Sequence, residues 1–527
     1  MWLISAAAEH DSRTMSLLVY LLVTFQYALE ILTVVVTILI LISSIDDTFI
    51  DAWYWIREFY RWFWIRARYP ALSADALKAK PERPIAIMVP AWQESDVIRA
   101  MLETSHRLIQ YEDYRIFVGV YQNDPETIRE VQAAAQNLPR VTMAIVPRDG
   151  PTSKADCLNV ILGEILSHEE TTGRQFSGIA MHDAEDVIHP YELPLFNYLL
   201  DRMDLIQLPV YSFHRPLREV VAGTYMDEFA EWHSKDLVVR ESITGIVPCA
   251  GVSACFSRTA LSMLRSERDG EVFSTSSLTE DYDIAFRLKK LGRREIFVRF
   301  PVRFTIEASN EVSQPMQLEK ELPIATREFF PSNFRAAYRQ RARWLLGIAF
   351  QGWSEHGWGS SIGAKYFFLR DRKGLLTSPT AVLAYIVMFG LIALELLYLS
   401  IPQEQRAPFW LLSTPWYYAL LLINILFLIN RIVQRMYFTT RIYGIRHGLM
   451  AGPRMVVSNL LNFFATLRAG YLFAQHKVTR KALVWDKTQH VYPVRELSVA
   501  TALGGQSGDA IEPPGPTGIP GTPSGRT

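Results

Sequence analysis

The chain has 527 residues, and its 54 Lys and Arg residues balance its 54 Asp and Glu residues. The length exceeds one ordinary domain, and the zero net charge argues against a dedicated DNA- or RNA-binding protein, which usually carries a basic excess. The three cysteines, Cys157, Cys249 and Cys255, are too few for a disulfide scaffold and match no zinc-binding spacing.

Apolar tracts predict three membrane-spanning helices. Residues 16–44 are long enough to cross a bilayer and include one charged side chain, Glu30, for which a functional role and pairing with another helix both stay open. Residues 378–400 and 409–430 are the second and third candidates. A fourth apolar region, 449–475, contains Pro453 and several polar residues, so we expect an interfacial or re-entrant helix there.

Basic residues beside these tracts predict the orientation. Basic side chains follow the first span between Arg57 and Lys80, and others follow the third span between Arg431 and Arg446. By the positive-inside rule both flanks face the cytoplasm, so the N-terminus lies outside and the large segment between spans one and two lies inside. Residues 51–65 interleave aromatic residues with Arg, which predicts a helix in the membrane interface, with packing on the soluble part as the alternative.

The large inner segment alternates short apolar runs with helical patterns. The strand candidates are 85–89, 116–120, 141–146, 178–182 and 205–209, and helical patterns lie between them at 97–110, 125–136 and 153–166. This rhythm predicts a mainly parallel sheet with helices on both faces, in which ligands bind beyond the carboxyl ends of the strands. The sequence has no phosphate-binding P-loop, and no G-x-G-x-x-G follows the first strand, which argues against a dinucleotide site.

Two acidic motifs and one basic helix are the candidate site. Asp183, Glu185 and Asp186 follow the fourth strand and repel one another unless a cation such as Mg²⁺ or Mn²⁺ sits among them; a solvated acidic turn is the alternative. Thr279-Glu280-Asp281 precedes a helical stretch, where it offers either a general base or a helix cap. An Arg-rich helix at 329–344 predicts either a solvated or headgroup-facing surface or a diphosphate site.

Six motifs in order resemble the membrane-integrated family 2 glycosyltransferases, which include cellulose and hyaluronan synthases. They are Val89–Glu94, Asp124, the step from Gly150 through Lys154 to Asn159, Asp183–Asp186, Thr279–Asp281, and Gln340 with Arg343 and Trp344. Four segments are most similar to the bacterial phage-adsorption protein B group of that family: 150–159, 182–190, 343–353 and 485–490. The resemblance implies a cytoplasmic glycosyltransferase domain of GT-A type fused to transmembrane and interfacial α-helices.

The resemblance also implies a role for each motif. The donor would bind at Pro90, Glu94, Asp124, Lys154 and Asp183; the cation, Mg²⁺ or Mn²⁺, at Asp183, Glu185 and Asp186; and the acceptor and diphosphate at Gln340, Arg341, Arg343 and Trp344. Asp281 would be the general base, beside Glu280 and Thr279. The family pattern is Asp-x-Asp, whereas Glu185 and then Asp186 stand here, so the cation ligand stays open between them. Residues 248–254 lie where the family places its acceptor-contacting loop.

The function implied is an inverting transferase of the bacterial inner membrane that extends and translocates an exopolysaccharide. Its implied partners are a UDP-linked or other nucleotide-diphosphate sugar, the growing glycan, membrane lipid and an outer-membrane export partner, and no nucleic acid. The alternatives are a non-processive transferase to a lipid-linked acceptor and a catalytically silent export or phage-receptor scaffold. Cyclic-di-GMP regulation stays open, although the sequence has no recognisable binding domain for that nucleotide.

The sequence therefore predicts eight segments. They are an external segment (1–14), a first span (15–45), an interfacial helix and linker (46–80), the glycosyltransferase domain (81–325), interfacial helices with Q-x-x-R-W (326–375), two spans (376–435), a C-terminal interfacial or re-entrant helix with the Trp485–His490 segment (436–500), and a disordered tail (501–527). Trp485–His490 is a hypothetical lid over the site.

Overall fold

The structure is a computed structural model that describes residues 2–267, 270–310, 313–359, 361–403, 406–479 and 492. The predicted lid at 485–490 and the predicted tail at 501–527 lie outside these ranges.

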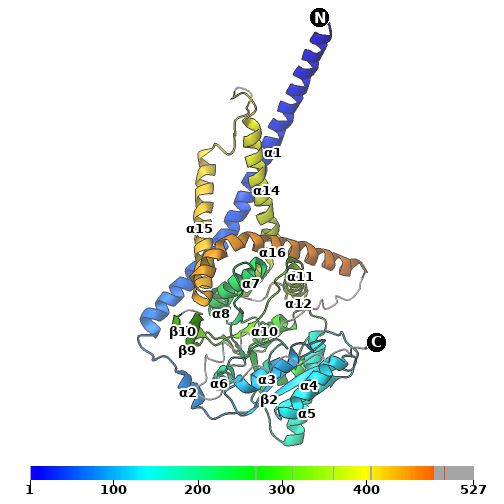
Figure 1. Cartoon of the computed structure of the whole chain (residues 1–527), viewed down its shortest axis with the longest axis vertical. Helices are drawn as coiled ribbons and strands as arrows, with labels where there is room; N and C mark the ends of the chain where they lie inside the picture. Colours follow the sequence, from blue (N-terminus) through cyan, green and yellow to red (C-terminus); the bar gives the residue numbers. More distant parts are fainter. Residues whose placement is uncertain are drawn as a thin grey trace, which may run out of the picture. The chain divides into compact units, whose positions relative to one another are not determined.

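A seven-stranded sheet forms the centre of the globular part (Figure 1), in the order β3-β2-β1-β4-β7-β5-β8. Strands β1 to β4 are mutually parallel, β8 is parallel to β5, and β7 runs antiparallel to both of its neighbours. The strands are β1 (Ile85–Pro90), β2 (Tyr114–Tyr121), β3 (Val141–Val146), β4 (Gly178–Met181), β5 (Leu205–Gln207), β6 (Val210–Ser212), β7 (Ala254–Ser257), β8 (Glu295–Phe297), β9 (Pro301–Asn310), β10 (Ser313–Pro323) and β11 (Thr326–Glu328).

The helical segments connect and cover these strands or form the long apolar helices of the chain. They are α1 (Trp2–Tyr60), the π-helical turn η1 (Arg61–Ile65), α2 (Ala74–Lys78), α3 (Ile98–Leu108), α4 (Pro125–Asn137), α5 (Lys154–Thr172), α6 (Glu192–Leu199), α7 (Val220–Glu231), η2 (Trp232–Asp236), α8 (Leu237–Thr244), α9 (Arg258–Glu267), α10 (Glu280–Lys290), α11 (Phe334–Leu345), η3 (Leu346–Gln351), α12 (Gly352–His356), α13 (Ile362–Arg372), α14 (Gly374–Tyr398), α15 (Pro415–Tyr443) and α16 (Ile445–Thr479).

The predicted sheet with helices on both faces is confirmed by its burial. All six residues of β1 are buried, which requires cover on both faces because side chains alternate along a strand. On one face, Met88 of β1 packs with Leu158 and Ile161 of α5 and with Ile284 of α10. Ser153 begins α5 by accepting a hydrogen bond from the backbone N–H of Asp156, so the start of α5 is fixed just beyond the sheet.

The antiparallel strand β7 determines which loops meet at the site. The carboxyl ends of parallel strands lie at one edge of a sheet, and an antiparallel strand begins at that same edge. Residues 248–253, which precede β7, therefore reach the edge at which β1, β2 and β4 end. Strands β6 and β11 form a separate parallel pair, and Val187 bridges to Arg327, so β11 lies beside the loop after β4.

Three helices are long and apolar enough to cross a membrane, at Tyr20–Ile65, Gly374–Tyr398 and Pro415–Tyr443. They agree with the three predicted tracts. The first differs in one respect: the predicted span and the predicted interfacial helix at 51–65 form one uninterrupted helical stretch, because no proline or glycine breaks it. The fourth apolar region is the continuous helix α16, which contacts α15, α11 and α7; in Figure 1 it runs across the direction of α14 and α15.

Two polar residues of α1 bind the loop between α14 and α15. The Oε2 atom of Glu30 accepts hydrogen bonds from the backbone N–H groups of Leu411 (2.8 Å) and Leu412 (3.3 Å). The Nε2 atom of Gln26 donates to the carbonyl oxygens of Ala407 and Pro408. Of the roles left open for Glu30, the structure shows contacts within the protein, and the partner is the backbone of the connecting loop as well as Gln26 of the same helix.

Buried charges join the lower half of α1 to the globular part. Lys235 of η2 is 1% exposed and binds Asp51 of α1 and Glu231 of α7. Nearby, Arg370 of α13 pairs with Asp46 of α1 and with Asp236 of η2. Charges that are removed from water in this way require their partners, so these contacts fix the position of α1 against α7, η2 and α13.

The hairpin of β9 and β10 falls largely in a second compact unit, Val302–Leu322, separate from the rest of the described chain.

Candidate active site

Three motif residues from distant parts of the sequence meet at the carboxyl edge of the sheet. The Nζ atom of Lys154, in the first turn of α5, lies 2.5 Å from Oδ1 of Asp183, which follows β4. The same nitrogen donates to the carbonyl oxygen of Gly251 at 3.4 Å. A Cβ atom placed on Gly251 would lie 2.6 Å from Oδ2 of Asp281 and 3.4 Å from Nζ of Lys154. The structure thus brings Lys154, Asp183 and Asp281 around one backbone position.

Gly251 makes this approach possible. Its φ is +79°, which L-residues with a Cβ rarely adopt, and the space in which a side chain would stand is taken by the Asp281 carboxylate. The loop is supported by Gln207 at the end of β5, whose Nε2 donates to the carbonyl oxygens of Leu208 and Val252 and whose Oε1 accepts from the N–H of Ala250. Neither residue was predicted individually, although a glutamine in the apolar run Leu205–Pro209 is a signal of a buried polar support.

The charged groups around Gly251 shift one another's pKa values. Burial opposes the charged form of Lys154, but the carboxylates of Asp183, Glu280 and Asp281 outweigh it and raise the pKa of Lys154. Burial raises the pKa of Glu280 to about 8, and the neighbouring Asp281 adds to that shift while Lys154 opposes it. Burial likewise raises the pKa of Asp281. A carboxylate with a raised pKa is a stronger base than one in water, which suits Asp281 to accept a proton.

The acidic motif after β4 is not a solvated turn, because Glu185 and Asp186 are buried. The Oδ2 atom of Asp186 accepts hydrogen bonds from the N–H of Asp183 and lies 3.0 Å from Nδ1 of His182, whose Nε2 lies 2.7 Å from Oε1 of Glu192. Although burial opposes the charged ring, Glu192 and Asp186 raise the pKa of His182 to about 10. A protonated His182 between two carboxylates therefore fixes the orientation of Asp186.

Glu328, at the end of β11, adds a fourth carboxylate to this motif. Its pKa lies well above the usual range because of burial and because of the negative charges of Asp186, Glu185 and Asp183. Sequence reasoning missed Glu328, since it lies about 140 residues after the motif and in no recognised pattern. The bridge between Val187 and Arg327 is what places it there.

Two observations fit a divalent cation at this motif. The Oδ1 atom of Asp186 is buried and has no hydrogen-bond partner within the described ranges, and four carboxylates lie close enough to affect one another's charge. Mg²⁺ and Mn²⁺ take such oxygen ligands. Within the described part of the chain, a group of three possible metal ligands with ligand atoms within 4.8 Å of one another lies at another place, at Asp283, Glu355 and His356. The ligand atoms of the three acids in the predicted motif lie farther apart than that.

Asp124 joins the ends of the first two strands. Its Oδ2 accepts a hydrogen bond from the N–H of Gln93 at 2.5 Å, and its Oδ1 caps α4 by accepting from the N–H of Thr127. The N–H of Glu94 in turn donates to the hydroxyl of Thr127. Pro90 is the last, buried residue of β1. The predicted donor residues at the ends of β1 and β2 are therefore neighbours, with Asp124 as the link between them.

Thr279 connects the acidic pair to the basic helix. It stands at the N-cap position of α10, but its side chain makes no capping hydrogen bond, so the capping alternative is wrong for Thr279. A Cβ atom on Gly347 of η3 would lie 2.4 Å from the Thr279 hydroxyl oxygen. Gln351, also in η3, accepts from the N–H of Leu278 and donates to the carbonyl of Ser276. The segment after Q-x-x-R-W thus packs on the loop that leads to Asp281.

The predicted acceptor residues on α11 have different surroundings. Arg341 is buried; it pairs with Glu228 at 2.7 Å and donates to Thr224 of α7, so its charge is already matched. Gln340 carries a buried amide oxygen with no hydrogen-bond partner among the described residues. Trp344 packs against Tyr225, Phe229 and Phe330. Arg343 is half-buried.

Comparison with known proteins supplies the family. Residues 178–440 match the model of the glycosyl transferase family group 2. The chain is 44% identical over 474 residues to bacteriophage adsorption protein B of Escherichia coli strain K12 and to bacteriophage N4 adsorption protein B of Escherichia coli O157:H7. Each alignment covers 89% of this chain and 63% of the relative, so this chain spans less than two thirds of either relative's length.

Solved structures give more distant similarities. A mannosyltransferase from Pyrobaculum calidifontis in complex with GDP-Man and Mn²⁺ has 16% sequence identity and a TM-score of 0.44, over 82% of this chain and 99% of that one. Glucosyl-3-phosphoglycerate synthase from Mycobacterium tuberculosis has 16% identity and a TM-score of 0.23, over 37% of this chain and 64% of that one. The family match and the mainly parallel sheet confirm the predicted GT-A type of domain, and the identity confirms the predicted likeness to the phage-adsorption protein B group.

Proposed function

Because residues 178–440 belong to the glycosyl transferase family group 2, we propose that this chain transfers a hexose from a nucleotide-diphosphate sugar to a growing glycan, with inversion at the anomeric carbon. The observation that carries the proposal is the meeting of Lys154, Asp183 and Asp281 around Gly251, at the sheet edge where α/β proteins bind ligands.

Asp281 is the proposed general base. Its carboxylate accepts the proton of the acceptor hydroxyl while that oxygen bonds to the anomeric carbon and the bond to the diphosphate breaks on the opposite face. Its raised pKa supports this role, because the proton-accepting strength of a carboxylate rises with its pKa. Lys154 keeps its positive charge among three carboxylates and offers a cation to the departing diphosphate.

Mg²⁺ or Mn²⁺ fits the donor half of the site. Asp183 and the free Oδ1 of Asp186, or Glu185, would hold the ion, with Glu328 beside them. When bound, the ion would neutralise negative charge that develops on the nucleoside diphosphate. Asp124, Glu94 and Pro90 are proposed to contact the nucleoside because they gather at the ends of β1 and β2.

The acceptor is proposed to bind along α11. The unpartnered amide oxygen of Gln340 needs a hydroxyl or N–H donor, which a sugar supplies. The ring of Trp344 offers a flat surface for sugar stacking, and Arg343 offers a cation for the diphosphate. Arg341 contributes by fixing α11 to α7 through Glu228.

The three apolar helices support a multi-pass protein of the bacterial inner membrane with its catalytic domain in the cytoplasm. Since α11 and η3 precede α14 with only the short helices α12 and α13 between them, an acceptor on Gln340 and Trp344 lies close in sequence to the second span. We therefore propose a processive synthase that passes an exopolysaccharide through the membrane, toward an export partner in the outer membrane. A UDP-linked donor is the form we would test first.

The substitution Asp281→Asn tests the activity. The expected result is a loss of transfer of about 10²–10⁴-fold, the usual contribution of a general base, with unchanged binding of the nucleoside diphosphate measured by calorimetry. The control is Asp75→Asn, an exposed carboxylate in the first turn of α2, which should transfer as the unchanged protein does.

Two outcomes contradict the proposal. Normal transfer by the Asp281→Asn protein would remove Asp281 as the base. Absence of transfer and of donor hydrolysis by the unchanged protein, with Mg²⁺ or Mn²⁺ and a panel of nucleotide sugars, would favour the silent scaffold. Product length decides the remaining choice, because only a processive enzyme makes polymer from a single donor, and single addition indicates the lipid-linked acceptor.

A further inference from the structure

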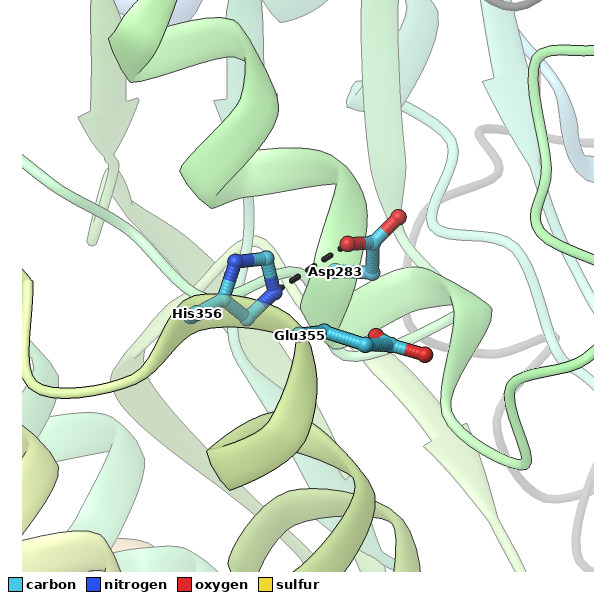
Figure 2. Close-up of side chains that lie close together, drawn as sticks. All are labelled: Asp283, Glu355 and His356. Atoms are coloured by element: carbon cyan, nitrogen blue, oxygen red, sulfur yellow. Dashed lines mark ion pairs between the residues drawn. The ribbon is translucent and has the colours of Figure 1, made fainter.

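A second group of metal-binding side chains lies on α10 and α12, away from the acidic motif after β4. Figure 2 shows Asp283 and His356 turned toward each other, with the side chain of Glu355 beside them. Each offers one possible ligand atom, and these three atoms lie within 4.8 Å of one another. We propose that this group binds a transition-metal ion of the Zn²⁺ type, which goes beyond the proposed glycosyl transfer.

His356 is the residue that points to a ligand. Its side chain is 3% exposed, and neither ring nitrogen makes a hydrogen bond within the described ranges. Its Nε2 lies 3.1 Å from Oδ1 of Asp283, yet the pair does not have hydrogen-bond geometry. The ring is packed against Phe286 and Phe368. A buried imidazole nitrogen beside a carboxylate oxygen is the arrangement that a coordinated metal ion requires.

A simple ion pair between Asp283 and His356 is the competing explanation. It would leave both ring nitrogens of His356 without a hydrogen bond inside the described ranges, because the pair lacks hydrogen-bond geometry. Asp283 also has another cation nearby, since Arg287 lies 3.4 Å from its Oδ2. An ion shared by His356 and both carboxylates would give one ring nitrogen a partner and bring Glu355 into the same site.

The ligand set selects the metal. One imidazole nitrogen and two carboxylates suit Zn²⁺ and related transition metals, whereas Mg²⁺ prefers oxygen ligands alone. Ligand atoms around Zn²⁺ lie about 2.0–2.2 Å from the ion, so Glu355, which is exposed and adjacent to a helix end, needs only a small movement. Three protein ligands leave a fourth position for water.

This site is distinct from the catalytic one although Asp281 and Asp283 are close in sequence. Residues two apart on a helix do not share a face. Asp281 faces Gly251 and Lys154, whereas Asp283 faces His356 of α12. An ion at Asp283 would join α10 to α12, and α12 directly follows η3, in which Gly347 and Gln351 pack on the loop before Asp281. The ion would therefore stabilise the position of the acceptor helix relative to the proposed base.

The test uses the full chain, without a polyhistidine tag, purified in detergent and stripped of metal with EDTA. Zn²⁺ is the only transition metal added, by equilibrium dialysis. The buffer contains excess Mg²⁺, which occupies the all-oxygen motif around Asp183. Bound zinc is then measured by mass spectrometry. The unchanged protein should bind one Zn²⁺ more per chain than His356→Gln and than Glu355→Gln. His106→Gln, an exposed histidine of α3, is the matched control and should bind as much as the unchanged protein.

A second measurement keeps the test independent of folding. Zn²⁺ should raise the Tm of the unchanged protein and of His106→Gln, because a ligand that binds the folded state stabilises it, and should leave the Tm of Glu355→Gln unchanged. Glu355 is exposed, so its substitution removes a ligand without opening the core. Equal zinc content in all four proteins, or an equal Tm shift in the unchanged protein, His106→Gln and Glu355→Gln, would overturn the proposal. Sugar transfer is not part of either readout.

Discussion

Gly251 shows how much the proposed site depends on one missing side chain. The loop before β7 brings its backbone against the carboxylate of Asp281 and the amine of Lys154, which a Cβ atom would meet at 2.6 and 3.4 Å. Gly173, which ends α5, has a similar φ of +68° but no atom within 4 Å of an added Cβ. A side chain at Gly173 would therefore meet only the conformational cost of a positive φ, whereas a side chain at Gly251 would also clash with Asp281 and Lys154.

The substitution Gly251→Ala should abolish transfer, and Gly173→Ala should leave it unchanged. Both lose roughly 1–2 kcal/mol of stability from a left-handed alanine, measurable by chemical unfolding in detergent. The added methyl group at position 251 also displaces the Asp281 carboxylate, so the loss of transfer should exceed what unfolding explains. Equal rates of sugar transfer by the Gly251→Ala and Gly173→Ala proteins would show that the close approach of Gly251 to Asp281 is not needed for catalysis.

The sequence predicts the charged residues of the site better than their support. Asp183, Lys154 and Asp281 lie in short motifs at strand or helix ends, where position alone indicates a ligand edge. Gln207, Glu328 and Gly251 belong to the same place only because distant strands meet, and no local pattern records that meeting. Arg341 shows the reverse problem, because it lies at an unspecified position inside Q-x-x-R-W and was predicted to bind the acceptor or diphosphate, whereas its contact with Glu228 belongs to packing.

At the scale of elements, the buried charges between α1 and the globular part matter most. Lys235 binds Asp51 and Glu231, and Glu231 also binds Arg431 and Arg435 of α15. The sequence does not predict this network, because its members are up to 384 residues apart and each looks like an ordinary charged helix residue. Removal of one member leaves opposite charges in a place without water.

The substitution Lys235→Met should destabilise the protein by about 3–5 kcal/mol, the usual cost of breaking a buried ion pair. The double substitution Lys235→Met with Asp51→Asn should recover part of that loss, because it removes the unpaired carboxylate. Lys365→Met, on the exposed face of α13, is the control and should change stability little. Unfolding by denaturant in detergent measures all three, and equal stability of Lys235→Met and the control would contradict a role for the network.

The strands predicted from apolar runs agree closely with the structure, but three short strands, β7 and the hairpin of β9 and β10 were not predicted. The predicted strand 141–146 coincides with β3, and 85–89 lacks one residue of β1. Strands β6, β8 and β11 have three residues each, too few to show a period of two. The missed strand β7 is the element that brings Gly251 to the site, so its omission is why the loop before it was known only by resemblance.

At the scale of the whole molecule, the three apolar helices can be oriented in a membrane in two ways. The basic residues that flank them predict the orientation in which the catalytic domain is cytoplasmic. The described residues offer two exposed positions for a test, Gln403 between α14 and α15 and Lys365 on α13. The native Cys157, Cys249 and Cys255 are buried and give little background to thiol labelling.

A membrane-impermeant maleimide added to spheroplasts should label Gln403→Cys and should label Lys365→Cys only after the membrane is permeabilised. The reason is that the short loop follows the second span on the outside, while α13 precedes that span on the inside. The opposite pattern would reverse the orientation, and labelling of both positions in intact spheroplasts would contradict a span between them.

The hydrogen bond between Glu30 and the backbone of Leu411 can form only late in the synthesis of the chain. The two residues are 381 positions apart, a distance that a ribosome covers in about 20–80 s at roughly 5–20 residues per second. During that interval the first helix carries Gln26 and Glu30 without the backbone groups that they bind in the finished protein. The polar contacts of the first helix are therefore complete only after the residues that precede α15 have been made. A chain truncated before Leu411 leaves Oε2 of Glu30 without its backbone donors, while Gln26 of the same helix still donates to Oε1.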